Sequence, residues 1–147
     1  MAEAGFRKVE RDRERRFGSP GILLAGYTAA EAAAIRALLD RIGAAAVPLV
    51  ACSAALLERT VADALTAVDP GEPAGPGQLP RVLLMSGLTG EEFHRLMDEF
   101  GETGMPRPIF AAATPTNLQF TVKQLLIELL REQRAMAETR AAPRREE

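Results

Sequence analysis

Apolar residues along the chain form two kinds of pattern that alternate. Four short runs are almost continuously apolar, and they span residues 22–25, 47–51, 82–86 and 109–113. Such runs predict short strands that are buried on both faces. In the segments that follow them, apolar residues recur every three or four positions, which predicts amphipathic helices. The pattern therefore predicts an α/β domain in which four strands alternate with four helices.

Two prolines predict the order of the strands. Pro48 and Pro108 lie at the start of the second and fourth strands. A proline nitrogen cannot donate a hydrogen bond to a neighbouring strand, so these two strands are placed at the edges of the sheet. Alternation of strands and helices favours parallel pairing, with helices on both faces. We therefore expect a three-layer, doubly wound, four-stranded parallel sheet in the order 2-1-3-4.

The first half of the chain has a counterpart in the second half. Residues 22–31 correspond to residues 83–92, which lie 61 positions later, and a second correspondence is offset by 60 positions. We interpret residues 21–68 and 81–130 as two βαβα repeats, separated by a Pro/Gly-rich loop over residues 69–80. Two such halves, related by a pseudo-twofold axis parallel to the strands, give the strand order 2-1-3-4.

The length of 147 residues corresponds to one domain with a core of its own. Both ends of the chain mix charges of the two signs and contain little apolar surface to bury. We therefore expect a charged flexible arm over residues 1–18, a single α/β domain over residues 19–132, and a charged flexible tail over residues 133–147.

Charge and composition restrict the partners. Residues 21–130 contain twelve Asp and Glu residues against seven Arg and Lys residues, a net charge of −5, which argues against nucleic acid as a partner. No apolar stretch is long enough to span a membrane, and the N-terminal residues lack the apolar segment of a secretory signal. The single cysteine, Cys52, cannot form an internal disulfide. We expect a cytoplasmic protein without a membrane partner.

The same helix-capping pattern occurs after the first and third strands. Thr28 with Glu31, and Thr89 with Glu92, fit the S/T-x-x-E capping box, in which the two side chains bond to free amide groups of the first helical turn. This structural role is the favoured interpretation of the four residues.

Ligands of doubly wound sheets bind outside the carboxyl ends of the strands, where successive connections leave toward opposite faces. In the order 2-1-3-4 this crevice lies between the first and third strands. Two helix N-termini would converge there and favour an anionic or carbonyl-bearing ligand, although their glutamates oppose an anion. The segment after the fourth strand adds a cluster of uncharged polar residues. The expected ligand-binding residues are Gly26, Tyr27, Thr28, Ser86, Gly87, Thr89, Thr114 and Asn117.

Several enzyme classes are excluded because the sequence motifs that they need are missing. The dinucleotide-binding pattern G-x-G-x-x-G and the phosphate-binding pattern G-x-x-x-x-G-K-[ST] are missing, and no aspartate ends the third strand. The one histidine, His94, has no spaced metal-binding or catalytic partners. We expect no metal, no cofactor and no catalytic residues. The enzymatic alternative that stays open is a small hydrolase or transferase that uses Ser86, Thr114 or Cys52.

The second half also resembles a known family. The paired strand-Gly-x-[ST]-x-x-Glu segments, and the segment P-R-P-I-F-A-A-A-T-P-T-N-L-Q-F-T-V-K-Q-L-L, are similar to a bacterial domain-of-unknown-function family of small tandem βα proteins. The similarity is strongest over residues 81–131. Thr114 and Asn117 match the T-x-x-N step of that family, and Phe120 stands where it has an aromatic residue. The resemblance implies the fold and implies no activity.

Taken together, these patterns favour a non-catalytic regulatory or binding module, whose partner is an unidentified small ligand or protein. The alternative from a different class is a protein that self-associates through an edge strand or a helix face, which leaves a homodimer open.

Overall fold

The structure, a computed structural model, describes residues 17–141 of the chain. It contains the four strands and four helices that the sequence predicts, in the same alternating order. Three short 3₁₀ helices lie in the connections between these elements. The bounds are β1 (Gly21–Ala25), α1 (Ala29–Arg41), β2 (Leu49–Ala51), α2 (Val61–Leu65), β3 (Val82–Ser86), α3 (Gly90–Glu99), β4 (Ile109–Ala112) and α4 (Val122–Ala141).

The strands form one sheet in the predicted order, β2-β1-β3-β4, with the two proline-led strands at its edges. β1 and β2 are parallel, and so are β3 and β4. The two central strands, however, are antiparallel, and Leu23 lies opposite Leu84. The sheet is therefore mixed, and the prediction of an all-parallel, doubly wound sheet is wrong in the direction of the second half.

The direction of β3 follows from the long connection that precedes it. α2 already brings the chain back to the start of β1, because the Leu65 side chain lies 3.6 Å from the position that a Cβ of Gly21 would occupy. The 16 residues between α2 and β3 then return along the sheet, and Ala74 N donates to Cys52 O just after β2 (3.0 Å). A chain of this length easily spans a five-residue strand of about 17 Å. β3 thus begins at the end of the sheet where β1 and β2 finish.

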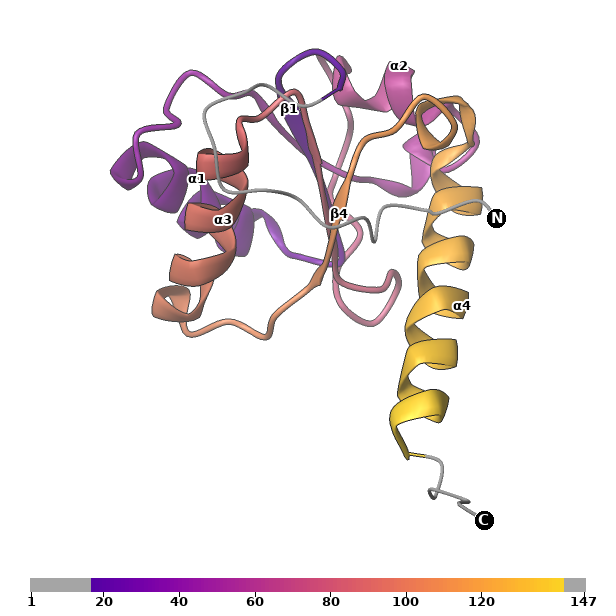
Figure 1. The fold of residues 1–147 in the computed structure, drawn as a ribbon. Coiled ribbons are helices and arrows are strands. Elements are labelled where there is room, and N and C mark those ends of the chain that lie inside the picture. The colour runs from indigo at the N-terminus through magenta and orange to yellow at the C-terminus, as the bar shows by residue number, and fades with distance from the viewer. Residues whose placement is uncertain (1–16, 142–147) are drawn as a thin grey trace.

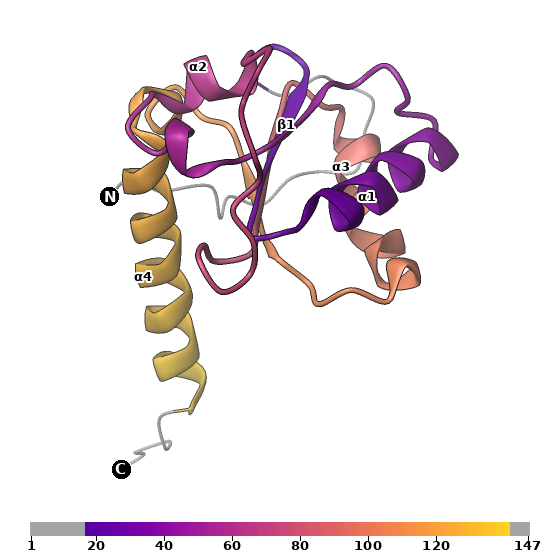
Figure 2. The ribbon, with the colours of Figure 1, turned by 180° about the vertical axis from the view of Figure 1, so that it is seen from behind.

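Each face of the sheet carries its own apolar core. In Figure 1 and Figure 2, α1 and α3 lie together on one side of the strands, and α2 and α4 lie on the other. Strand residues alternate between the two cores, as the pleat requires. The first core contains Ile22, Leu24, Ile35, Leu38, Leu39, Leu83, Met85, Phe93, Leu96 and Phe100, and the second contains Leu23, Ala25, Val61, Ala64, Val82, Leu84, Val122, Leu125 and Leu129.

The two halves are arranged about an axis perpendicular to the sheet, and not about one parallel to the strands as expected. Leu23 pairs with Leu84 in the sheet, and Thr60 forms an isolated antiparallel bridge with Thr121 on the α2 and α4 side. In both pairs the partners are 61 positions apart. Only a rotation about this perpendicular direction keeps α1 and α3 on the same face while it reverses the strands.

The structure adds detail at both ends of the described chain. Phe17 O accepts a hydrogen bond from Gly87 N (3.0 Å), so Phe17 and Gly18, assigned to the flexible arm, contact the domain. The rest of the arm lies outside the described residues. α4 continues to Ala141, past residue 132, where we placed the end of the domain. No helix within residues 17–141 combines the length and the apolar character needed to cross a membrane.

Two glycines allow the close approach of the loops that flank the central strands. Gly26 and Gly87 both have positive φ angles (+83° and +68°). A Cβ at Gly26 would lie 2.5 Å from Pro80 O, and a Cβ at Gly87 would lie 2.5 Å from Gly18 O. Both clashes would be with backbone atoms, which cannot be relieved by rotation of a side chain.

We predict that Gly26→Ala and Gly87→Ala each lower the free energy of unfolding by about 2 kcal/mol or more, because strain at positive φ adds to a backbone clash. The matched control is Gly43→Ala, since Gly43 also has a positive φ of +88° but no neighbour within 4 Å of its would-be Cβ. Urea denaturation measures all three. Equal losses in the three variants would contradict the packing described above.

Candidate functional site

The antiparallel centre of the sheet divides the predicted site into two. Ala25, at the carboxyl end of β1, lies opposite Val82, whereas Ser86, at the carboxyl end of β3, lies opposite Gly21. The loops after β1 and β3 therefore lie at opposite ends of the sheet. We call these the β1 end and the β3 end, after the central strand that finishes there. The prediction that the two loops form the walls of one crevice is wrong. The turn after β4 lies at the β3 end, because Ala113 N donates to Met85 O (2.9 Å).

At the β1 end, the predicted ligand-binding residues are engaged by the protein itself. The Tyr27 side chain is 1% exposed, and its hydroxyl donates to Pro106 O (2.6 Å). The Arg81 guanidinium lies 4.5 Å from the centre of the Tyr27 ring and 3.5 Å from a Glu31 carboxylate oxygen. Burial raises the pKa of Tyr27, and Arg81 partly opposes this shift. Thr28 and Glu31 form the predicted capping box. None of these groups lines one of the three cavities described below.

At the β3 end, the polar cluster after β4 is a closed turn. Thr114 N donates to Asn117 Oδ1 (2.8 Å), and Asn117 N donates to Thr114 Oγ1 (3.0 Å). The Asn117 amide also donates to Ala112 O (3.0 Å), and the Asn117 side chain is fully buried. Thr89 caps α3 together with Glu92, as predicted. These residues hold the backbone of this end in place.

Ser86 differs from the other predicted residues. Its side chain is 1% exposed, and its Oγ atom has no hydrogen-bond partner among the described residues. A buried polar group without a partner is uncommon, because it loses water without compensation. By the alternation of the strand, Ser86 faces the same side as Val82 and Leu84, toward α2 and α4. The hydroxyl group therefore sits at the end of an otherwise apolar strand.

A cavity of about 260 Å³ lies next to this hydroxyl group, and we name it the Ser86 pocket. The chain segment before β1 closes one side, because a Cβ at Gly18 would clash with Ser86 Oγ. The half-buried Leu65 and Leu118 line the middle, and exposed residues form the mouth. The described residues that line it are Ser19, Pro20, Ala62, Leu65, Thr66, Ser86 and Leu118. Only Ser86 belonged to the site predicted from the sequence.

A second cavity, also of about 260 Å³, occupies the corresponding place in the other half, and we name it the α4 groove. Ala25 replaces Ser86 at the equivalent strand position, so the hydroxyl group is unique to one half. The described lining residues are Leu57, Glu58, Leu79, Pro80, Lys123, Leu126, Ile127 and Leu130. Five of them lie 61 positions from a residue of the Ser86 pocket, in the pairs Ser19/Pro80, Ala62/Lys123, Leu65/Leu126, Thr66/Ile127 and Leu118/Leu57.

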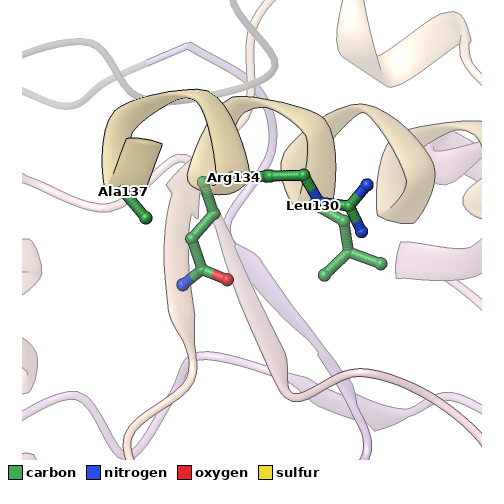
Figure 3. A pocket seen from close by; sticks show the side chains of 4 residues that line it. Leu130, Arg134 and Ala137 are labelled. Atoms are coloured by element: carbon green, nitrogen blue, oxygen red, sulfur yellow. The ribbon is translucent and has the colours of Figure 1, made fainter. Parts of the chain in front are cut away.

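A third hollow, of about 460 Å³, follows α4 where this helix runs past the end of the sheet. The described residues that line it are Leu130, Gln133, Arg134 and Ala137. Figure 3 shows that the labelled side chains all come from this one helix. No polar groups from a second described element converge on it, so it lacks the features of a specific small-molecule site.

The other candidate groups are also placed by the structure. Burial raises the pKa of the Cys52 thiol from 9.0 to about 11, so the thiolate nucleophile is disfavoured at neutral pH. Cys52 follows β2, at the end of the sheet opposite Ser86. The half-buried His94 lies beside Phe93, with a distance of 5.9 Å between the ring centres. Within residues 17–141, no three His, Cys, Asp or Glu side chains are grouped as metal ligands.

The fold and the Ser86 pocket define a small α/β domain with a mixed four-stranded sheet and a cavity at the β3 end. Residues 81–136, which include β3, α3, β4 and most of α4, match the family described as Domain of unknown function (DUF3783). The match agrees with the resemblance seen in the sequence and covers the half that contributes Ser86. No curated protein and no solved structure is significantly similar to the chain.

We predict that Ser86→Ala raises the free energy of unfolding by about 1 kcal/mol, because it removes a buried hydroxyl group that bonds to no described residue. The matched control is Ser53→Ala. Ser53 is equally buried, but its hydroxyl donates to Pro70 O, so its loss should destabilise the domain by a similar amount. Urea denaturation of the two variants distinguishes the expected gain of stability from the expected loss. A loss of stability in Ser86→Ala equal to that in Ser53→Ala would mean that the Ser86 hydroxyl already has a partner.

Proposed function

We propose that this protein is a non-catalytic binding module that holds a small ligand in the Ser86 pocket. The observation that carries the proposal is the buried Ser86 hydroxyl, which borders a cavity and bonds to no described residue. Such a group costs about 1–3 kcal/mol of stability. A ligand that hydrogen-bonds to it offsets this cost, which gives a reason for a serine at a position where the other half has Ala25.

The size of the cavity supports a small ligand. Its volume of about 260 Å³ lies just below the range of about 300–1,000 Å³ that is typical of sites for drug-sized molecules. A water molecule takes up about 30 Å³ in the liquid, so the space exceeds that of a single bridging water. The cavity therefore suits a fragment-sized molecule.

The chemistry of the site favours binding over catalysis. Activation of a serine nucleophile needs a base within hydrogen-bonding distance, and no described residue that lines the Ser86 pocket is ionisable. Thr114 Oγ1 already accepts a hydrogen bond in the turn after β4. The alternative of a hydrolase or transferase that uses Ser86, Thr114 or Cys52 is accordingly not favoured.

The roles proposed for the candidate residues follow from their places in the fold. Ser86 contacts the ligand. Gly87, Thr89, Thr114 and Asn117 hold the surrounding backbone at the same end of the sheet. Gly26, Tyr27 and Thr28 lie at the other end, and in this proposal they do not contact the ligand.

We predict that isovaleramide, a small probe with one amide group and a branched apolar body, shifts the amide resonances of Ser86, Gly87 and Leu118 in a two-dimensional NMR titration. The resonances of Gly26, Tyr27 and Thr28 should stay unchanged. Ala62→Leu, which adds bulk at the exposed mouth of the pocket, should abolish the shifts, whereas Lys123→Leu at the equivalent position of the α4 groove should preserve them. Shifts that survive Ala62→Leu, or that map to α4, would refute the proposed site.

A second candidate function, self-association, is favoured by a different observation. Ile127 and Leu130, three positions apart on α4 and therefore on one face of the helix, are large apolar residues, each with an exposed fraction of 39%. Apolar side chains that recur along one helix often mark an interface. A light-scattering mass of twice 15.8 kDa, restored to the monomer value by Leu130→Glu, would favour this function for the α4 surface.

A further inference from the structure

We infer that the ligand of the Ser86 pocket is an uncharged molecule with a compact apolar body and one hydrogen-bonding head, such as an amide, an alcohol or a ketone. This inference rests on the proposed function and specifies the class of ligand. It follows from the side chains that line the cavity and from their depth.

The polar side chains among the described residues that line the cavity all carry hydroxyl groups. Ser86 provides one at the buried end, and Ser19 and Thr66 provide two at the exposed mouth. Leu65 and Leu118 are half-buried, so their exposure is intermediate between that of Ser86 and that of the mouth residues. A ligand that matches this order has its head at Ser86 and its apolar body against the two leucines.

A charged head is disfavoured at the buried end. Moving an ion out of water costs far more than moving a neutral polar group, and the cost is recovered only by an opposite charge or by several hydrogen bonds. No described lining residue carries a charge, and a single hydroxyl group cannot replace the water around an ion. Burial of a neutral carbonyl or hydroxyl costs far less, and one hydrogen bond with Ser86 offsets part of that cost.

The neighbouring helix ends do not supply the missing charge. Residues Leu65 and Thr66 at the pocket belong to the C-terminal end of α2, which carries the negative end of any helix dipole. The N-terminus of α3, which follows Ser86 in the chain, is capped by Thr89 and has Glu91 and Glu92 in its first turn. An anion is therefore opposed at both helices, and the carbonyl-bearing alternative of the sequence-based hypothesis is retained.

The α4 groove provides an internal comparison. It has the same volume of about 260 Å³, and five of its lining residues correspond to residues of the Ser86 pocket. The strand position equivalent to Ser86 is Ala25, which has no hydroxyl group, and Glu58 and Lys123 add charges to the lining. If apolar burial alone decided binding, both cavities would take the same ligands. Recognition through the Ser86 hydroxyl predicts binding in one half only.

Four probes with the same branched apolar body test the inference: isovaleramide, isoamyl alcohol, isovalerate and isopentylammonium. Dissociation constants come from NMR titrations of the full chain at pH 7, where the last two probes are charged. We expect the amide and the alcohol to bind at least about tenfold more tightly than either ion. Ser86→Ala should weaken binding of the amide by about tenfold or more. Ala25→Ser, which places a hydroxyl group at the equivalent strand position, should leave the affinity of the Ser86 pocket unchanged.

The possible results separate the two proposals. Equal or tighter binding of isovalerate or isopentylammonium at the Ser86 pocket would overturn the inferred ligand class but keep the binding function. Binding of the neutral probes with unchanged affinity in Ser86→Ala would overturn recognition by the hydroxyl group. If none of the four probes shifts the resonances of Ser86, Gly87 and Leu118, the binding function and the inferred class both fall.

Discussion

The antiparallel pairing of β1 with β3 is the interaction on which the rest of the structure depends. Backbone groups of Ile22 and Leu24 point to β2, since Ile22 N donates to Pro48 O and Leu24 O accepts from Cys52 N. The N–H and C=O groups of Leu23 therefore point to β3, and the pair of Leu23 with Leu84 exchanges hydrogen bonds directly. This pairing reverses the second half, places α1 beside α3, and sends the loops after β1 and β3 to opposite ends of the sheet.

The two halves correspond in their secondary-structure elements but differ in the residues around the corresponding cavities. The capping boxes, the two glycines with positive φ and five lining residues of each cavity recur 61 positions apart. Ser86 and Ala25 differ at the buried strand end, and α4 has twenty residues where α2 has five. A hydroxyl group at one cavity, and a long helix with exposed apolar residues beside the other, are the features from which a ligand site and an association surface can be argued.

Local chemistry in the sequence predicts much of the fold. Pro48 and Pro108 correctly place β2 and β4 at the edges, and the threonine and glutamate pairs correctly predict the caps of α1 and α3. The direction of β3 cannot be derived in the same way, because parallel and antiparallel halves give the same order and bury the same apolar runs. The informative signal is the 16-residue connection after α2, which is longer than a parallel arrangement needs.

The site is less predictable than the fold, because it depends on that direction. Thr114 and Asn117 look like ligand-binding groups in the sequence, yet they bond to each other within a turn. The sequence points to Ser86 only by its place at a strand end, whereas the structure distinguishes it by a buried hydroxyl group without a described partner. The mouth of the pocket comes from residues of α2 and the segment before β1, which the sequence alone does not bring together.

The most direct test of this account is a measurement of the pairing between the two central strands. Because Leu23 and Leu84 form a hydrogen-bonded pair, the neighbouring pairs, Ile22 with Met85 and Leu24 with Leu83, are of the type in which the Cα atoms approach to about 4.5 Å. The account predicts strong nuclear Overhauser effects between the Hα protons of both pairs in the NMR spectrum of the isotope-labelled protein. Their absence, together with contacts that place Gly26 beside Gly87, would show a parallel centre and contradict the division of the two loop clusters.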